Sequence, residues 1–574
     1  MITAWFNLSP FIVAQWIASI AFLSCWLFFA SDAFTRALWT RHWKVLLTAI
    51  LIVIVWRIPL RSTFFHGLEY EDAYVYTVSG RQSIDLQQYD SRNVGSVYLV
   101  SVCAVGNLGS CYLSQTYSGH YIGFPSIIRL TMRLFGYNPA ISNYVGLFAS
   151  CIAVVMVFLI CQLVTTDLVS AIAACMVFAS TPIFAVYGVG SYAEPASNAC
   201  ISVSLFCYLR YMYKHHDNGF VRIINWCAFT LTLVLAVLIK RENIILAIGL
   251  PLISSGLLLI HSRPQLIDRK KLQCAFWGAV VAASFGAIEL HLIQTVLNET
   301  GEYAGFPFAI SNAKALLPMF LSSFISPRWY LFTFIFVFLG IGTAYRKSLT
   351  FFPVLLFVGY MMLYTTHVRS YYQLHGASTS PADALRLSMN LMSLWSILAG
   401  LGIGAAMRFG EVKVGDRKIV VTAIACLYAG VSYLMTTDLQ RRSRSAELSS
   451  RVEPALVASR LITQAAPSHT YIVTIEPLVV QMFASATVNV MALPAISPRL
   501  LTKLAGDDPG ATLLFVKQNG YDNQYAHERY ASQLGCLEGL RSEEIYVGST
   551  FSVLKMSLPV DDRVECKPAS RLAR

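Results

Sequence analysis

Apolar runs without Asp, Glu, Lys or Arg recur along the first three quarters of the chain. Many of them are close to the roughly 20 residues that a helix needs to cross a bilayer. We therefore predict a polytopic α-helical membrane protein with about twelve spans. The predicted spans are Leu8–Ala30, Val45–Leu60, Ala140–Val164, Val169–Val186, Ala196–Tyr213, Ile223–Ile239, Ile244–Ile260, Cys274–Leu297, Trp329–Tyr345, Phe351–Thr365, Leu385–Met407 and Ile419–Thr436.

Composition excludes a string of soluble domains. Of the 574 residues, 56% are hydrophobic and only 13% are charged, whereas soluble proteins have roughly 25% charged residues. The formal net charge of +12 would suit a nucleic-acid partner. Basic residues beside membrane spans are the more usual cause, so we expect no nucleic acid.

The basic residues also predict an orientation. With the 31–44 loop placed inside, the inner loops carry 15 Lys and Arg and the short outer loops carry 5. Because Lys and Arg accumulate in cytoplasmic loops, both termini and a long loop at 59–139 are expected outside. The chain shows no evident retention signal for the endoplasmic reticulum, which favours a bacterial inner (plasma) membrane.

The tail beyond the last predicted span changes character. Its segments are an amphipathic stretch at Val452–Ala465, a strand-like Tyr471–Ile475, another helical stretch, Thr487–Met491, a loop at Asp507–Gly510 and a strand-like Thr512–Val516. Alternating elements predict a small α/β domain. We expect a transmembrane domain at 1–436, which includes the outer loop, and an extracytoplasmic domain at 437–574.

Cysteine positions agree with this topology. Nine of the 13 cysteines fall within predicted spans, where cysteine behaves as a small hydrophobe. The other four lie in regions assigned outside, where an oxidising compartment permits disulfides. The candidate disulfide residues are Cys103 and Cys111 in the loop, and Cys536 and Cys566 in the tail.

A cluster of acids opens the outer loop. Glu69, Glu71 and Asp72 lie within four residues and are interleaved with Tyr70 and Tyr74. Neighbouring carboxylates raise the pKa of at least one of them, and such groups serve as general bases or cation ligands. The alternative is a solvated acidic loop; the position directly after a span favours function.

Glu194 is the second candidate. It is the only charged residue between Asp167 and Arg210, in a short loop at the predicted outer end of a helix pair. The alternative role is a helix N-terminal carboxylate, favoured by the helix dipole just before Pro195.

Lys240 and Arg241 form the third candidate, because the predicted topology places both outside, against the charge bias of the other loops. Basic residues there call for an anionic partner such as a phosphate. Arg328 and Arg386, at the outer starts of two later spans, would join the same site. Taken individually, an arginine such as Arg328 or Arg386 is more often a residue at the membrane interface than part of an anion site. The alternative is that one span has been miscounted and this loop lies inside. The charges of every later loop argue against that alternative.

Carboxylates and cations at one membrane face suit attack by an acceptor on a substrate with a phosphate leaving group. A carboxylate would deprotonate or orient the acceptor. Lys240 and Arg241 would stabilise the charge that develops on the phosphate. A lipid-linked phosphosugar fits, since its tail would lie in the bilayer.

These residues resemble a known family, the polyprenyl-phosphate-dependent GT-C glycosyltransferases, which include protein O-mannosyltransferases and the lipid A aminoarabinose transferase. The family's first outer loop opens with an acidic pair followed by aromatics, which Glu71-Asp72-Ala73-Tyr74-Val75-Tyr76 resembles. Further similar segments, in order between about Trp56 and Trp395, are Gly119-His120 with Pro125, Arg133-Leu134-Phe135-Gly136, Ser180-Thr181-Pro182, Tyr187 to Glu194, Leu238-Ile239-Lys240-Arg241 and Ser326-Pro327-Arg328.

The resemblance implies a GT-C-like fold and transfer of a sugar from a polyprenyl-phosphate donor to a glycan, lipid or protein acceptor, with inversion. By it, Glu71 and Asp72 are catalytic with Glu194 as a second acid. Lys240, Arg241, Arg386 and Arg328 bind the donor phosphate, and Glu69, Tyr74 and His120 bind substrate. Some family members use a divalent cation; Glu71, Asp72 and Glu194 would be its ligands here.

Two other classes remain open. A secondary transporter is compatible with twelve spans, although the chain lacks the two similar halves typical of transporters. An assembly protein with a partner-binding tail is the second.

Overall fold

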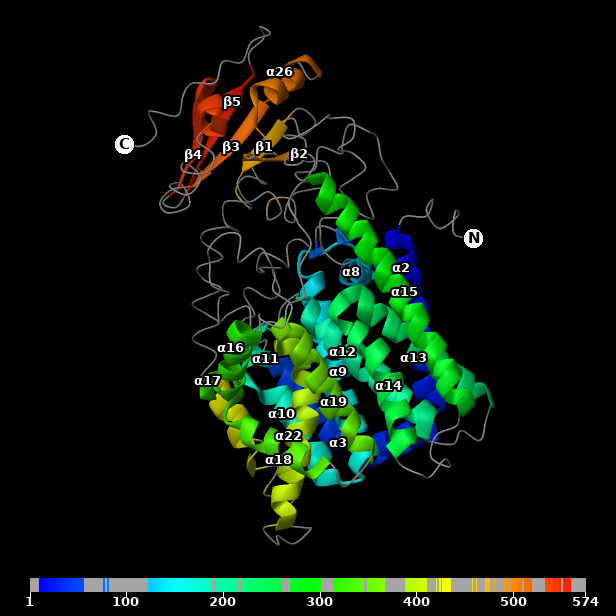
Figure 1. Ribbon diagram of the computed structural model, residues 1–574. Coiled ribbons are helices and arrows are strands. Elements are labelled where there is room, and N and C mark those ends of the chain that lie inside the picture. Colours follow the sequence, from blue (N-terminus) through cyan, green and yellow to red (C-terminus); the bar gives the residue numbers. More distant parts are fainter. Residues whose placement is uncertain are drawn as a thin grey trace.

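The computed structural model describes residues 10–55, 76–77, 80–81, 122–187, 192–213, 219–260, 269–300, 313–344, 348–366, 388–409, 420, 423–424 and 426–434 of the helical part. In the tail it describes residues 457, 461, 470–474, 480, 489–493, 496–507, 510, 512–518, 532–548 and 551–558. Helices form one bundle, and a small sheet lies beyond the end of the bundle at which α8 is found (Figure 1).

The bundle consists of helices with the following bounds: α2 (Pro10–Ser31), α3 (Ala33–Val55), α8 (Gly123–Phe135), α9 (Ile141–Thr165), α10 (Leu168–Ser180), α11 (Pro182–Tyr187), α12 (Ala193–Tyr213), α13 (Gly219–Ile239), η3 (Arg241–Asn243), α14 (Ile244–Ile260), α15 (Arg269–Thr300), α16 (Ala313–Ile325), α17 (Pro327–Tyr330), α18 (Thr333–Ala344), η6 (Ser348–Thr350), α19 (Phe351–Thr366), η7 (Met389–Leu391) and α22 (Met392–Phe409). Every predicted span overlaps helical residues, the last of them at 420, 423–424 and 426–434.

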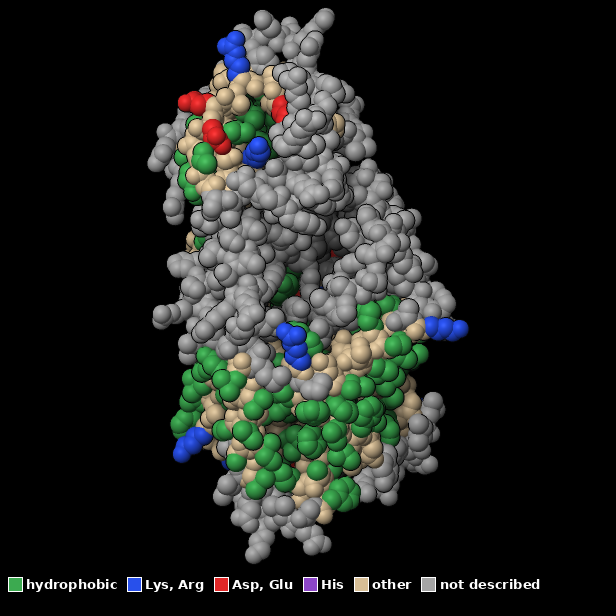
Figure 2. Space-filling view, turned by 90° about the vertical axis from the view of Figure 1, so that its left-hand side faces the viewer, with side chains coloured by type: hydrophobic (Ala, Val, Ile, Leu, Met, Phe, Trp, Pro, Cys, Tyr) green, Lys and Arg blue, Asp and Glu red, His purple; other side chains and the backbone are tan. Residues whose placement is uncertain are grey.

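Six helices in the described part are long and apolar enough to cross a membrane. They are Val13–Ser31, Ala33–Val55, Ile141–Thr165, Gly219–Ile239, Arg269–Glu289 and Met389–Phe409. Four shorter apolar helices add to them at Leu168–Ser180, Leu316–Ile325, Thr333–Thr343 and Phe351–Thr366. Hydrophobic side chains cover a broad band of the bundle surface, with few Lys or Arg on it (Figure 2). The chain is a multi-pass helical membrane protein.

The second span differs from its prediction. The segment 31–44, predicted as an inner loop, is mostly helical because α3 begins at Ala33, so Arg36 and Arg41 lie on the helix. The backbone of His42 is non-helical, with φ −123° and ψ 16°, and divides α3 into a basic first part and an apolar second part. The apolar pattern predicted only the second part.

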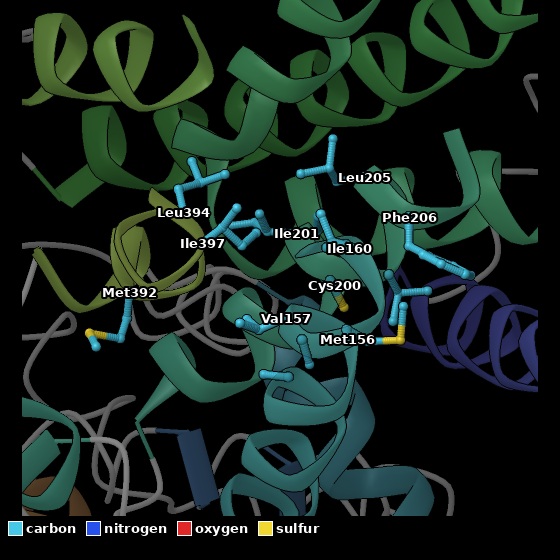
Figure 3. Close-up of a cluster of buried hydrophobic side chains, with 14 of the residues drawn as sticks. Met156, Val157, Ile160, Cys200, Ile201, Leu205, Phe206, Met392, Leu394 and Ile397 are labelled. Carbon is cyan, nitrogen blue, oxygen red and sulfur yellow. The ribbon is translucent and has the colours of Figure 1, made fainter. Parts of the chain in front are cut away.

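The bundle centre is packed from α9, α12 and α22. Met156, Val157 and Ile160 of α9 lie against Ile201 and neighbouring residues of α12, with α22 side chains beside them (Figure 3). These belong to one continuous core of buried residues. This core fixes α12, and therefore Glu194 at its start.

Glycines let α18 and α22 approach closely. A Cβ at Gly340 would clash with the carbonyl of Leu398, and one at Gly402 would clash with the carbonyl of Phe336. We expect Gly340→Ala to destabilise the protein by about 1–3 kcal/mol through overpacking. Gly342→Ala is the matched control on the same helix, because nothing lies within 4 Å of its added Cβ; it should be neutral or stabilising by about 0.5–1 kcal/mol. Thermal unfolding of the purified variants measures both, and equal effects would contradict the close approach.

The tail forms a five-stranded mixed sheet of order β2-β1-β3-β5-β4. Its elements are β1 (Thr470–Thr474), β2 (Asn489–Ala492), α26 (Pro498–Asp507), β3 (Thr512–Gln518), β4 (Arg541–Val547) and β5 (Phe551–Ser557). β1 pairs in parallel with β2 and β3, whereas β5 pairs antiparallel with β3 and β4. The strands predicted at Tyr471–Ile475 and Thr512–Val516 are confirmed. α26, β4 and β5 were not predicted.

Candidate functional site

Glu194 lies in the first turn of α12 and is fully buried. Proline is favoured at the first positions of a helix, and negative charge is favoured at its N-terminus. Pro195 and Glu194 therefore suit this helix start, which agrees with the alternative role of Glu194 as a helix N-terminal carboxylate. The position also brings the carboxylate to the end of a neighbouring helix.

Lys240 directly follows α13, which packs along α12. Its backbone is extended, with φ −151° and ψ 120°, so the chain leaves the helix there. Lys240 Nζ donates a hydrogen bond of 2.8 Å to Glu194 Oε1, and the two side chains are 4% and 0% exposed. The sequence predicted both residues as separate groups; packing makes them a buried ion pair.

Asn243 anchors the short helix η3 that follows Lys240. Its side-chain amide donates 2.8 Å hydrogen bonds to Ser197 Oγ of α12 and to the carbonyl of Ala236 in α13. Its side-chain carbonyl accepts from the Tyr360 hydroxyl at 2.8 Å and from the Asn390 amide at 3.2 Å. The backbone on both sides of Lys240 is therefore fixed by contacts to α12, α13, α19 and η7.

We expect Tyr360→Phe to lower the free energy of unfolding by about 0.5–1.5 kcal/mol, because the buried side-chain carbonyl of Asn243 loses the closer of its two donors. Thermal unfolding measures the loss. Tyr213→Phe is the matched control, since that hydroxyl is 3.5 Å from Ser254 Oγ and makes a weaker contact. A larger loss in the control would contradict the anchoring role of Tyr360.

A second buried acid, Glu242, completes this cluster. Glu242 is 6% exposed and interacts electrostatically with the hydroxyls of Tyr360 and Tyr364. Tyr364 also interacts with Glu194 and accepts a 3.0 Å hydrogen bond from Asn390. Neither tyrosine was predicted from the sequence. Their spacing of four residues, which puts them on one helix face, was the available signal.

The start of α8 lies against the end of α13. A Cβ at Gly123 would be 2.5 Å from the backbone of Leu238 and 2.6 Å from that of Ile239, so only glycine fits. The amide of Ile122 donates a 2.8 Å hydrogen bond to Glu289 of α15, and Arg241 interacts electrostatically with Glu289. The segment that follows His120 in the sequence is therefore adjacent to Lys240 in space.

The segment after the acidic motif also contacts α8. The Tyr76 ring meets Phe124 edge to face at 5.4 Å. The Thr77 hydroxyl donates a 2.9 Å hydrogen bond to Ser142 Oγ of α9. Tyr76, four residues after Asp72 in the sequence, therefore lies next to α8.

The remaining predicted site residues are placed as follows. Arg241 is half-buried next to Lys240. Arg328 is exposed on α17, with its guanidinium 5.4 Å from the Trp329 ring centre, and no contact found in the described residues joins it to Lys240. Cys536 is disulfide-bonded. The positions outside the described residues are Glu69, Glu71, Asp72, Tyr74, His120, Arg386, Cys103, Cys111 and Cys566.

No group of three His, Cys, Asp or Glu side chains with metal-site geometry occurs within the described part of the chain. Glu194, the one proposed cation ligand that lies in this part, is ion-paired with Lys240. In the described part of the chain, Glu194, Lys240 and Glu242 therefore form a buried cluster of acidic and basic side chains.

Neither the models of known protein families nor the sequences of curated proteins match this chain. Among solved structures it is similar to ArnT from Cupriavidus metallidurans bound to undecaprenyl phosphate, with 13% identity, a TM-score of 0.57, and coverage of 90% of this chain and 98% of that chain. Against apo ArnT the identity is 12% and the TM-score 0.54, over 88% of this chain and 97% of that chain. The chain therefore shares the overall fold of ArnT.

A weaker likeness is to the archaeal oligosaccharyltransferase AglB from Archaeoglobus fulgidus, in complex with an inhibitory peptide and a dolichol-phosphate. Its TM-score is 0.46 at 13% identity, over 90% of this chain and 74% of that chain.

Proposed function

We propose that this protein is a membrane glycosyltransferase that moves a sugar from a polyprenyl-phosphate donor to a glycan, lipid or protein acceptor. One observation carries the proposal: Lys240, a buried cation, is ion-paired with Glu194, and the start of α8 packs against the residues just before it. These are three of the segments that resemble GT-C motifs. The similarity to ArnT bound to undecaprenyl phosphate supports it.

In the proposed reaction, the donor phosphate approaches Lys240, whose ammonium stabilises the negative charge on the leaving phosphate. The acceptor hydroxyl or amine attacks the sugar carbon from the opposite side, which inverts its configuration. Glu71, with Asp72 beside it, takes the proton from the acceptor. Glu194, which accepts the 2.8 Å hydrogen bond from Lys240 Nζ, holds the ammonium in position.

The proposed setting is a bacterial inner membrane, with the active site, the outer loop and the tail domain facing the exterior. The 1–436 part would carry catalysis. Glu71, Asp72 and Glu194 remain the proposed ligands should a divalent cation take part, and Arg241, Arg328 and Arg386 remain proposed contacts to the phosphate.

Purified protein in liposomes, given a labelled polyprenyl-phosphate sugar and a membrane extract as the source of acceptor, tests this function. We expect label to move to an acceptor and polyprenyl phosphate to be released. A secondary transporter would instead carry substrate across the vesicle wall without cleaving the sugar–phosphate bond. Flux without cleavage would therefore overturn the proposal.

A further inference from the structure

Arg129 of α8 is a buried cation to which the proposed reaction gives no role. Its side chain is 1% exposed and is among the largest fully buried side chains. Within the described part of the chain its Nε has no hydrogen-bond partner, and none of the ion pairs found there includes Arg129. A guanidinium presents five donors in a rigid fork that matches phosphate oxygens.

The charge on Arg129 is uncompensated by its own helix. No Asp or Glu occurs in α8, and Arg133 lies four residues further along, where like charges on a helix repel each other. Burial and then Arg133 lower the pKa of Arg129 to about 10, so the guanidinium stays protonated at neutral pH. Among the described residues no acidic side chain forms an ion pair with Arg129. A buried charge without a counter-charge is costly, and an anion held by both arginines would lower that cost and their repulsion.

The end of α8 points to the kind of anion. Leu134 and Phe135, which follow Arg133 directly, are 69% and 80% exposed. Exposed apolar residues beside basic ones on an amphipathic helix are typical of a helix at the membrane interface. An anion reaching this helix is therefore expected to belong to a membrane lipid.

Arg129 lies further along α8 than Gly123, the residue that packs against the end of α13 just before Lys240. The two residues are six positions apart along the helix, which is about 9 Å at 1.5 Å per residue. We propose that Arg129 and Arg133 bind the phosphate of an anionic lipid headgroup at this second position, independently of the donor phosphate.

Full-length protein in nanodiscs of phosphatidylcholine, with or without phosphatidylglycerol, tests this site by thermal unfolding and by the number of lipids retained in native mass spectrometry. We expect phosphatidylglycerol to raise the unfolding midpoint of the wild type. Arg129→Met should lose this response and weaken lipid retention about tenfold or more, while in phosphatidylcholine alone it should be at least as stable as the wild type. Arg133→Gln should reduce the response, and Arg222→Gln, an exposed charge-matched control, should leave it unchanged.

Each of the following outcomes would contradict the proposed lipid site. Equal destabilisation of Arg129→Met in both lipids would mean that Arg129 is only structural. An equal response to inorganic phosphate would mean that the ligand is not a lipid, and a response to undecaprenyl phosphate that Lys240→Ala removes and Arg129→Met retains would assign the anion to the Lys240 site. Should Arg129→Met not fold, an unchanged response in Arg133→Gln would be decisive against the site.

Discussion

Lys240→Ala is expected to reduce sugar transfer at least ten- to hundredfold and to weaken donor use more than acceptor use. A hydrogen bond to a charged group contributes about 1.5–3 kcal/mol. Of the two substrates, the ammonium would contact only the donor, at its phosphate. The same change removes the ion-pair partner of buried Glu194, which costs about 3–5 kcal/mol of stability. Steady-state kinetics with each substrate varied in turn measures the first effect, and thermal unfolding measures the second.

A double variant separates the two effects. Glu194→Gln combined with Lys240→Met replaces the ion pair by neutral groups of similar size, so stability should return towards that of the wild type. Transfer should stay low, because no cation is left for the phosphate. Recovery of transfer in the double variant would show that Lys240 serves the fold alone, and an equal loss of donor and acceptor use in Lys240→Ala would count against phosphate binding.

Glu71→Gln is expected to abolish transfer while expression stays intact. Glutamine keeps the size of the side chain but cannot accept the proton, and general-base catalysis contributes about 10²- to 10⁴-fold. Transfer of labelled sugar in membranes, normalised to protein amount by immunoblot, measures the effect.

Glu69→Gln is the matched control, because it removes one charge from the same cluster without touching the acidic pair. It should lower activity less than Glu71→Gln does, because Glu69 is expected to bind substrate and not to take the proton. Asp72→Asn tests the neighbouring acid, and a greater loss there than in Glu71→Gln would move the base to Asp72. Unchanged activity in both variants would remove the acidic pair from the mechanism.

The helical part of the fold could be predicted because apolar length alone indicates a span. The first part of α3 was missed for the same reason: Arg36, Arg41 and Lys44 break the apolar run although the backbone there is helical. In the tail, the apolar β1 and β3 were found, whereas β4 was not. Its sequence Arg541-Ser542-Glu543-Glu544 is polar and its side chains are largely exposed at the sheet edge, so no alternation marks it.

Single residues of the site could be predicted from the sequence, but their contacts with one another could not. Glu194 stood out as an isolated charge, and Lys240 with Arg241 as basic residues on the predicted outer side. Their pairing depends on how α12 packs along α13, which no local pattern records. Asn243 and Tyr360 were missed because a buried asparagine or tyrosine looks ordinary in sequence, and only the hydrogen bonds between them reveal their role.

The most direct test is an experimental structure of the full chain with bound polyprenyl phosphate. We predict that a phosphate oxygen lies within about 2.7–2.9 Å of Lys240 Nζ, as in charge-assisted hydrogen bonds, and that Glu71 and Asp72 line the same cavity. A phosphate bound elsewhere, with Lys240 contacting only Glu194 and the acidic pair outside the cavity, would contradict the proposed mechanism.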